Sequence, residues 1–253
     1  LVNCVQSLTA APPAVPHEII VVDNASTDGS TDAARTAGAT VIALDRNVGF
    51  AAANNVGIQA SRGECLLLLN SDTLVPAGAI DRLLARLQGV PDAAIAGPRL
   101  VDAQHRAELS FGRMLSPWNE LRQKVIGRLY DARFSPVERW TARQLSREHA
   151  VDWVSGACLM VWRTDAEAVG LLDERFFLYT EDADFCASIR ARGRRVLFTP
   201  AAEVVHLRGR SRAARPQASQ IAYRRSHLAF YEKHHPAWAG LLKAYLRLKG
   251  ERP

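Results

Sequence analysis

The run EIIVVDNASTDGS at residues 18–30 decides the fold of this chain. Residues 18–22 form a short apolar stretch with β-branched side chains, which is typical of a buried parallel strand. Asp23 and Asn24 begin a polar turn, and a helix follows until Gly38 ends it. A strand that passes through a polar turn into a helix predicts a βαβ unit, and ligands bind outside the carboxyl ends of such strands.

Strand and helix alternate through about residue 100, after which the pattern changes. In the first part the alternation predicts strands at 40–44, 64–69 and 94–96 and helices at 1–8, 50–60 and 77–87. The arginine-rich stretch 101–150 predicts loose helices. Beyond it the pattern predicts a strand pair or one bent strand at 151–161, helices from Thr164 and over 181–192, strands at 196–198 and 203–207, and a basic helical tail.

The composition is that of a soluble globular protein, with 48% hydrophobic and 23% charged residues in a chain of 253. No apolar run reaches the ~18 residues of a membrane span, and residues 1–16 lack the pattern of a signal peptide, so a cytoplasmic protein is expected. The four cysteines (Cys4, Cys65, Cys158 and Cys186) are far apart and form no CxxC pair. This spacing argues against zinc and favours buried free thiols, with a disulfide as the alternative.

The net charge of +6 is concentrated in arginine-rich stretches at 106–150, 190–195 and 208–225. Such patches suit nucleic acid, anionic lipid or a diphosphate, although each is by default a solvated face. They lack interleaved aromatic residues and any known nucleic-acid-binding motif, so no nucleic acid partner is expected.

Carboxylates follow three of the apolar runs. Asp23 follows the first, Asn70-Ser71-Asp72 follows the strand at 64–69, and Glu181, Asp182 and Asp184 open a helix. Carboxylates gathered at strand ends suit a divalent cation, a sugar hydroxyl or both. The structural alternatives are a turn for the first, a helix cap for the second and the helix dipole for the third. Three acids within four residues exceed what capping needs, so a general base is a candidate there.

His206 lies in the apolar strand at 203–207, where a lone histidine is more often a core residue than a ligand. The arginine-rich stretch after it suits a diphosphate, which favours a functional role. His234 and His235 lie in the basic tail and are predicted to be surface residues. The chain has no GxxxxGK[ST] loop, no GxGxxG after the first strand, no GxSxG elbow and no HExxH motif, which argues against the enzyme classes they mark.

Together these segments resemble glycosyltransferase family 2, in particular its rhamnosyltransferase-like branch. The resemblance is carried by residues 19–30, 46–55, 67–72, 153–157, 173–186 and 203–206, within a span of about 1–235. It implies the GT-A fold, an α/β fold with a Rossmann-like, mixed and mostly parallel sheet flanked by helices. It also implies a GT-A domain over 1–219, made of a nucleotide-binding half (1–100), a helical insert (101–150) and an acceptor and catalytic half (151–219), followed by a basic helical tail (220–253).

The resemblance implies roles for individual residues as well. Asp182 would be the catalytic base, with Glu181 beside it. The donor nucleotide would contact polar side chains near the ends of the first strands: Asp23, Asn24, Ser26, Asn54, Asn70 and Ser71. Trp153 and Gly156 would contact acceptor or donor sugar. Asp72, as the last acid of a DXD-like motif, and His206 would hold Mg²⁺ or Mn²⁺.

Two departures from the family pattern affect these expectations. Asn70 stands where the DXD motif has a carboxylate, which weakens the metal assignment slightly. The family's opening strand, which would precede the helix at 1–8, is missing, and its absence leaves strand edges unpaired. We therefore expect a fragment, or a chain with poor activity.

The leading hypothesis is a metal-dependent, inverting transferase of cell-envelope polysaccharide synthesis. By resemblance, it would move rhamnose from dTDP-rhamnose, a nucleotide-diphosphate sugar, to a glycan or polyprenol-linked acceptor. Its basic tail would then contact anionic lipid on the inner face of the cell membrane. The alternative from another class is a non-catalytic module that binds nucleotide sugar or polysaccharide.

Overall fold

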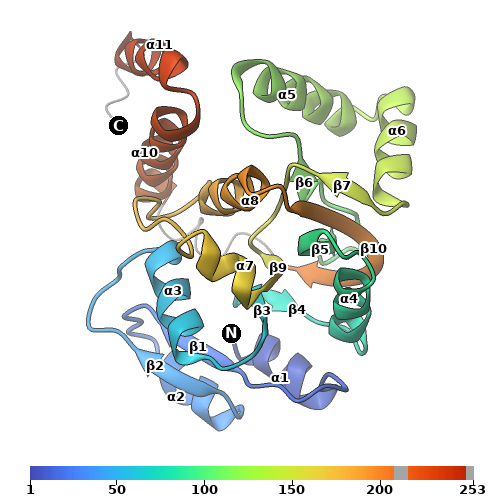
Figure 1. Cartoon of the computed structure of the whole chain (residues 1–253), viewed down its shortest axis with the longest axis vertical. Helices are drawn as coiled ribbons and strands as arrows, with labels where there is room; N and C mark the ends of the chain where they lie inside the picture. The colour runs from blue at the N-terminus through green and yellow to red at the C-terminus, as the bar shows by residue number, and fades with distance from the viewer. Residues whose placement is uncertain (208–215, 249–253) are drawn as a thin grey trace.

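A computed structural model of the chain describes residues 1–207 and 216–248 (Figure 1). Up to residue 101 helices and strands alternate: α1 (Val2–Ala10), β1 (Ile20–Asp23), α2 (Ser30–Thr36), β2 (Thr40–Ala43), α3 (Phe50–Ala60), β3 (Cys65–Leu69), β4 (Thr73–Leu74), α4 (Ala79–Gln88) and β5 (Ala93–Val101). The remaining elements are β6 (Phe111–Gly112), α5 (Pro117–Asp131), α6 (Ser135–Leu145), β7 (His149–Val151), β8 (Trp153–Val154), β9 (Cys158–Trp162), α7 (Arg163–Ala168), α8 (Glu181–Ala191), β10 (Arg195–His206), α10 (Pro216–His234) and α11 (Pro236–Leu248).

The central sheet is mixed and has helices on both faces, as the sequence predicts. Its order is β3-β9-β5-β10-β4, with β7 also paired to β10. β5 and β10 are parallel, whereas β9 runs against both β3 and β5, and β4 and β7 run against β10. The share of parallel pairing is lower than predicted because β9 lies between β3 and β5. The effect is that β3, β5 and β10 point their carboxyl ends the same way.

β1 and β2 form a separate two-stranded parallel sheet, in the register Ile20 opposite Thr40. This sheet lies at the bottom of Figure 1 with α1, α2 and α3 around it. Among the described strands, none pairs with both this sheet and the six-stranded one. Asp23, the last residue of β1, is therefore placed by the small sheet, whereas Asp72 follows β3 of the large one.

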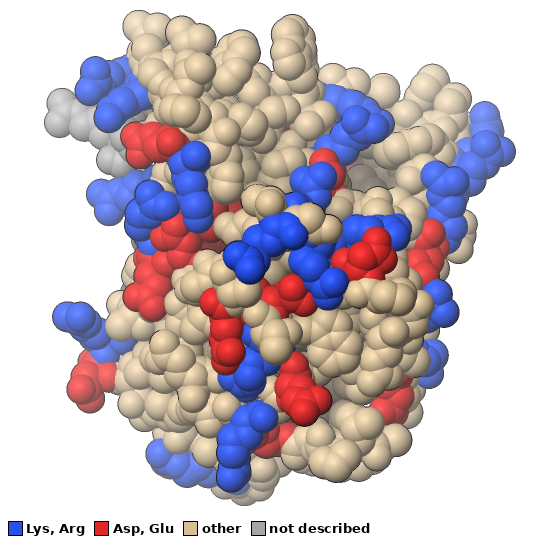
Figure 2. Space-filling view, viewed as in Figure 1, with Lys and Arg blue, Asp and Glu red and all other residues tan. Residues whose placement is uncertain are grey.

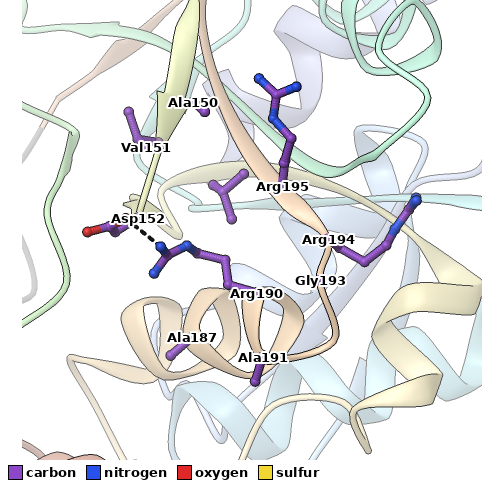
Figure 3. A pocket seen from close by; sticks show the side chains of 10 residues that line it. Ala150, Val151, Asp152, Ala187, Arg190, Ala191, Gly193, Arg194 and Arg195 are labelled. Carbon is purple, nitrogen blue, oxygen red and sulfur yellow. Dashed lines mark ion pairs between the residues drawn. The ribbon is translucent and has the colours of Figure 1, made fainter.

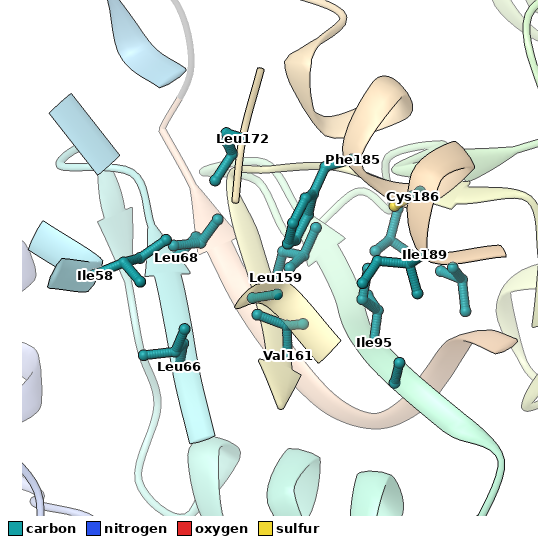
Figure 4. Packing of buried hydrophobic residues seen from close by; sticks show 14 of the residues in the cluster. Ile58, Leu66, Leu68, Ile95, Leu159, Val161, Leu172, Phe185, Cys186 and Ile189 are labelled. Atoms are coloured by element: carbon teal, nitrogen blue, oxygen red, sulfur yellow. The ribbon is translucent and has the colours of Figure 1, made fainter. Parts of the chain in front are cut away.

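Period-two alternation divides the side chains of the large sheet between two cores. Leu66 and Leu68 of β3 enter one cluster with Leu159 and Val161 of β9 (Figure 4). Neighbouring residues of the same strands, such as Met160, point to the other face and pack with α4. Phe185, Cys186 and Ile189 of α8 close the first cluster. Helix α8 is thus fixed to the sheet along its buried face, which positions the acidic residues at its start.

Four of the strand predictions differ from the strands observed. The two late strands are one strand, β10, whose pairing with β5 shifts register between Thr199 and Glu203. β5 is longer than 94–96 because Gly97 stays in the strand: a Cβ there would lie 2.6 Å from Val154 Cβ, so only glycine allows this approach. The stretch 151–161 contains parts of three short strands, β7, β8 and β9.

The insert and the tail are helical, as predicted. α5 and α6 fill most of the insert, and α10 and α11 form the described part of the tail. Phe230 and Tyr231 of α10 pack with Phe176 and with Ala183 of α8, so the tail lies against the segment that leads into α8. No helix within residues 1–207 and 216–248 combines the length and the apolar character needed to cross a bilayer.

Candidate active site

Asp72 and His206 lie together at the end of β10. The antiparallel pairing of β4 with β10 sets His206 opposite Thr73, the residue after Asp72. The distance between His206 Nε2 and Asp72 Oδ1 is 3.4 Å. His206 is thereby shown to lie beside an acidic group rather than in an apolar core.

Glu108 is the third member of this group, and its role has no signal in the sequence. Glu108 Oε2 lies 3.5 Å from His206 Nδ1, on the other side of the imidazole from Asp72. Burial lowers the pKa of His206, but the two carboxylates outweigh it and raise that pKa to about 9. His206 in turn lowers the pKa of Asp72. The two carboxylates thus favour the protonated ring, and a cation bound at His206 would displace that proton, because imidazole is a metal ligand only in its neutral form.

Glu181 and Asp182 open α8 in a largely buried setting. The Gly156 N–H donates to Asp182 Oδ2 at 2.9 Å, and the Ala183 N–H donates to Asp182 Oδ1 at 2.8 Å. Burial raises the pKa of Asp182, although these two N–H groups oppose it. Burial and the Asp182 charge together raise the pKa of Glu181 to about 8. Burial thus disfavours two charges at this pair, and the two N–H groups that donate to Asp182 favour its carboxylate form, which is the form a general base needs.

The backbone entering α8 is held in an unusual conformation. Tyr179 and Thr180 have φ angles of +70° and +64°, in the left-handed region that bulky side chains seldom adopt. The surrounding structure enforces this turn: the Ser226 hydroxyl of α10 donates to Leu178 O at 2.8 Å. Such strain is common at functional sites, where it aims side chains that a relaxed turn would not.

Asp23 and Asn24 hold the loops of the β1–β2 side. The Thr31 hydroxyl donates to Asp23 Oδ2 at 2.9 Å, and the Ser26 N–H donates to the same oxygen at 3.2 Å. Asn24 Oδ1 accepts from the Val48 N–H at 2.8 Å. The side-chain amide of Asn24 is thus already hydrogen-bonded to the backbone of the next loop. Its contact with a nucleotide-sugar donor stays a prediction.

Loop contacts bring three of these segments close to one another. Gly49, at φ +92°, fits directly against Phe177: a Cβ there would lie 2.6 Å from Phe177 O, and the Phe50 N–H donates to that carbonyl at 2.7 Å. The Asn70 N–H donates to Ala157 O at 3.0 Å, next to the Gly156 that holds Asp182. A Cβ at Gly156 would lie 3.7 Å from the Phe50 ring, so the Gly49–Phe50 turn, the Asn70-Ser71-Asp72 turn and the start of α8 all border residues 156–157.

The other predicted site residues vary in placement. Trp153 donates from Nε1 to Arg113 O at 2.9 Å and packs against the cluster of Phe176, Ala183, Phe230, Tyr231 and Ala239, which we call the cluster under α8. Asn54 donates to Phe50 O within α3, at 2.9 Å. Ser71 is exposed in its turn. The arginine-rich stretch at 208–215, to which we assigned the diphosphate, lies outside the described residues.

The donor set at Asp72 and His206 is compatible with a divalent cation. Across the described residues, no group of three or more His, Cys, Asp or Glu is already arranged to hold a metal ion. A carboxylate and an imidazole are nevertheless ordinary ligands of Mn²⁺, with diphosphate oxygens and water completing the shell. Asn70 Oδ1, two residues away, is buried without a hydrogen-bond partner. A buried acceptor atom without a hydrogen-bond partner is consistent with a ligand that binds at this turn.

A second missed feature links α10 to the start of α8. The Asp184 side chain is 2% exposed and is paired with Lys233 Nζ at 2.8 Å and His234 Nε2 at 2.6 Å. Lys233 Nζ also lies 2.9 Å from Asp173 Oδ2. One lysine thus ties both ends of the segment 173–184, which carries the strained turn.

The prediction that His234 and His235 are surface residues is wrong. His234 is the partner of Asp184, and the His235 imidazole is 2.8 Å from Leu115 O. The basic composition of the tail gave no indication of this role, because Asp184, the partner of His234, lies fifty residues earlier in the chain.

Replacing Lys233 with methionine is expected to lower kcat about tenfold and to destabilise the fold by roughly 2 kcal/mol, because Asp184 loses a buried partner. The donor KM should change little, since Lys233 acts by positioning. Lys233→Arg should restore most of the rate. Lys243→Met on exposed α11 is the control, and equal kinetics in the two methionine variants would remove the positioning role.

Glu181→Gln is expected to raise the melting temperature by an amount that grows with pH. The folded-state pKa of about 8 exceeds the ordinary 4.5, so wild type loses stability as pH rises through that interval, whereas glutamine does not titrate. Melting curves from pH 5 to 9 should show the difference widening and then levelling. A difference that stays constant, as expected for the exposed control Glu64→Gln, contradicts the raised pKa.

An open hollow of about 530 Å³ lies elsewhere, between the end of α8, the end of β7 and the start of β10 (Figure 3). Arg190 there is paired with Asp152 at 2.7 Å, and Arg194 and Arg195 are paired with Asp165 and Asp92. It contains none of the predicted site residues. Its arginines are engaged in these ion pairs, and the predicted catalytic residues Glu181 and Asp182 lie at the other end of α8.

The fold is that of the GT-A glycosyltransferases. The mannosyltransferase PcManGT from Pyrobaculum calidifontis, solved with GDP-Man and Mn²⁺, superposes with a TM-score of 0.58 at 19% identity over 92% of this chain. GalNAc-T7, solved with UDP, GalNAc and Mn²⁺, gives 0.58 at 16% identity over 81%. This chain spans 61% and 40% of those two solved chains, so the likeness concerns the fold alone.

The chain belongs to glycosyl transferase family 2, whose family model matches residues 1–168. It is 30% identical over 242 residues to N-acetylglucosaminyl-diphospho-decaprenol L-rhamnosyltransferase of Mycobacterium tuberculosis, covering 88% of this chain and 77% of that protein. It is 29% identical over 211 residues to the O-antigen biosynthesis protein RfbC of Myxococcus xanthus, covering 79% of this chain and 16% of that protein. The resemblance to the rhamnosyltransferase-like branch is thereby confirmed.

Proposed function

We propose that this glycosyltransferase moves rhamnose, with inversion, from a nucleotide-diphosphate donor such as dTDP-rhamnose to a glycan or polyprenol-linked acceptor in cell-envelope polysaccharide synthesis. The observation that carries the proposal is the buried pair at the start of α8, where the Gly156 and Ala183 N–H groups donate to the two oxygens of Asp182 and Glu181 is its neighbour. The rhamnosyl and decaprenol parts rest on the name of the mycobacterial relative.

In this mechanism Asp182 removes the proton from the attacking acceptor hydroxyl. The hydroxyl oxygen forms the new bond to the anomeric carbon as the bond to the donor diphosphate breaks on the opposite face, which inverts the configuration. Protonated Glu181 donates a hydrogen bond to a sugar hydroxyl, and Trp153 and Gly156 border the sugar. Asp23, Asn24, Ser26, Asn54, Asn70 and Ser71 border the nucleotide.

A divalent cation, Mg²⁺ or Mn²⁺, would be held by Asp72 and His206. When bound, it neutralises charge on the leaving diphosphate. Glu108 holds the His206 ring from the other side, which fixes its orientation in the way that carboxylates orient metal-binding histidines. The placement is cytoplasmic, with peripheral contact at the inner face of the membrane.

Thermal shift with a panel of nucleotide sugars, each with Mn²⁺ and with EDTA, tests the donor assignment. dTDP-rhamnose with Mn²⁺ at about a hundred times its Kd should stabilise by about 2.7 kcal/mol, a shift of roughly 5–10 °C, and EDTA should remove it. UDP-GlcNAc and GDP-mannose serve as controls. A larger shift with either of them overturns the rhamnose assignment, and a shift that survives EDTA overturns the metal.

A further inference from the structure

Two helices expose apolar stripes at the same end of the molecule. α5 buries none of its 15 residues. Its Trp118, Leu121 and Val125 are 74%, 56% and 47% exposed and recur at i, i+3 and i+7, so they share one face. A helix in a soluble domain ordinarily turns such a stripe inward, which indicates that this face has a partner.

α11 exposes a second apolar stripe with the same spacing, near the C-terminal end of the sequence. Trp238, Leu241, Tyr245 and Leu248 recur at i, i+3, i+7 and i+10, and Leu248 is 89% exposed. This stripe is distinct from the inner face of α11, where Ala239 and Leu242 pack into the cluster under α8. α11 is therefore already docked to the protein, and its exposed stripe is additional.

The two stripes lie at one end of the fold although they are more than a hundred residues apart in sequence. α5 and α11 stand at the top of Figure 1, on the opposite side of the large sheet from β1 and β2. Figure 2 shows the same end as a mainly uncharged surface with lysine and arginine at its margins. Both helices therefore expose apolar residues at the same end of the fold.

The charge around the stripes is positive. The exposed basic residues of the two helices are Arg122, Lys124, Arg128, Lys243 and Arg247, and α11 has no acidic residue. On α5, Glu120 is turned inward, where it accepts from the Tyr231 hydroxyl at 2.7 Å and lies 2.8 Å from His227 Nε2. Asp131, at the end of α5, is exposed and is outnumbered by the three exposed basic residues of that helix. An outward face with apolar stripes, tryptophans and basic margins has the chemistry that anionic lipid headgroups bind.

We propose that α5 and α11 together form a monotopic docking surface whose apolar stripes enter the headgroup region of a bilayer containing anionic lipid. This goes beyond the expected role of the basic tail, because it places half of the surface on the insert and gives the apolar stripes the main part. Both helices are tied to one cluster: Met114 and Leu115 before α5 pack with Tyr231, Ala239 and Trp153. Docking therefore holds the acceptor side of the site against the membrane, a link that rests on the proposed function.

Vesicle flotation tests the docking without reference to catalysis. Wild type should float with phosphatidylglycerol–phosphatidylcholine vesicles and much less with phosphatidylcholine alone. The pairs Trp118→Ser with Leu121→Ser and Leu241→Ser with Tyr245→Ser should each lower the partition coefficient by roughly tenfold or more. Val15→Ser, an exposed apolar residue between α1 and β1, should change nothing. Asp182→Asn should float like wild type.

Fluorescence with brominated phosphatidylcholine in the same vesicles locates the contact. Quenching should fall sharply in Trp118→Phe with Trp238→Phe, which keeps apolar rings, and should persist in Trp140→Phe on α6.

Unchanged flotation in both serine pairs, or unchanged quenching in the double phenylalanine variant, overturns the proposal. So does a dimer in sedimentation equilibrium that the serine pairs abolish while no form of the protein floats, because the stripes then face a second copy. Transfer to a water-soluble acceptor should survive in the serine pairs. If the wild-type protein itself transfers no sugar to such an acceptor, that result counts against the proposed function and not against the docking.

Discussion

Replacing Asp182 with asparagine should reduce the rate of sugar transfer about 10³-fold, the usual contribution of a general base. Asparagine keeps the size of the side chain, and its oxygen can still accept from the Gly156 N–H at the present 2.9 Å. Its melting temperature should fall by a few degrees at most, because the amide offers one acceptor where Asp182 serves both the Gly156 and the Ala183 N–H, while burial disfavours the charge that the substitution removes. The measurement is initial velocity with saturating donor, together with a donor thermal shift that should stay at the wild-type value.

The exposed Asp32→Asn on α2 is the matched control and should keep full activity. Transfer and donor hydrolysis at wild-type rates in Asp182→Asn would exclude Asp182 as the base. A wild-type protein that shows the donor shift but no transfer to any acceptor in a panel would favour the non-catalytic binding module.

Asp72→Asn should produce the second large loss, about 10²-fold or more in transfer, because the diphosphate then departs without its full charge compensation. The amide is isosteric with the carboxylate, so the turn that ends in Thr73 should persist. Titration of Mn²⁺ should show a clearly weaker apparent affinity in the variant, and the Mn²⁺-dependent part of the donor shift should shrink with it.

Asp32→Asn serves again as the control for removing one carboxylate. If Asp72→Asn keeps Mn²⁺-dependent activity with an unchanged affinity for Mn²⁺, the metal site does not lie at β4 and β10. Glu108→Gln adds a separate check: because Glu108 contacts His206 and not Asp72, it should weaken Mn²⁺ less than Asp72→Asn does.

Elements with strong local signals were predictable from the sequence. The helix at 50–60 has the predicted bounds as α3, and α8 begins at Glu181 as predicted. β10 was divided because Pro200 and its small neighbours break the apolar pattern, whereas tertiary pairing with β5 carries the strand through a register shift. Strand direction was less accessible, since nothing in the sequence of β9 shows that it lies between β3 and β5.

The candidate site was predictable only where family motifs mark it. Asp72 and His206 were expected to act together, and the structure brings them within 3.4 Å. Glu108 and Lys233 could not be predicted because each acts through a partner about fifty or a hundred residues away. Charged residues in an arginine-rich insert and a basic tail look like solvated surface until tertiary packing is known.

The division into two sheets has a consequence for how the protein opens. A two-stranded sheet has little stability of its own, so β1 and β2 depend on α2 and α3 packed around them. They should form a separate cooperative unit, with amides that exchange with solvent earlier than those of the buried strand β5. Such a partial unfolding would release the Asp23 loop while the Asp72–His206–Glu108 group stayed intact. If the nucleotide binds at Asp23 as proposed, this gives a route for product to leave that needs no motion of the large sheet.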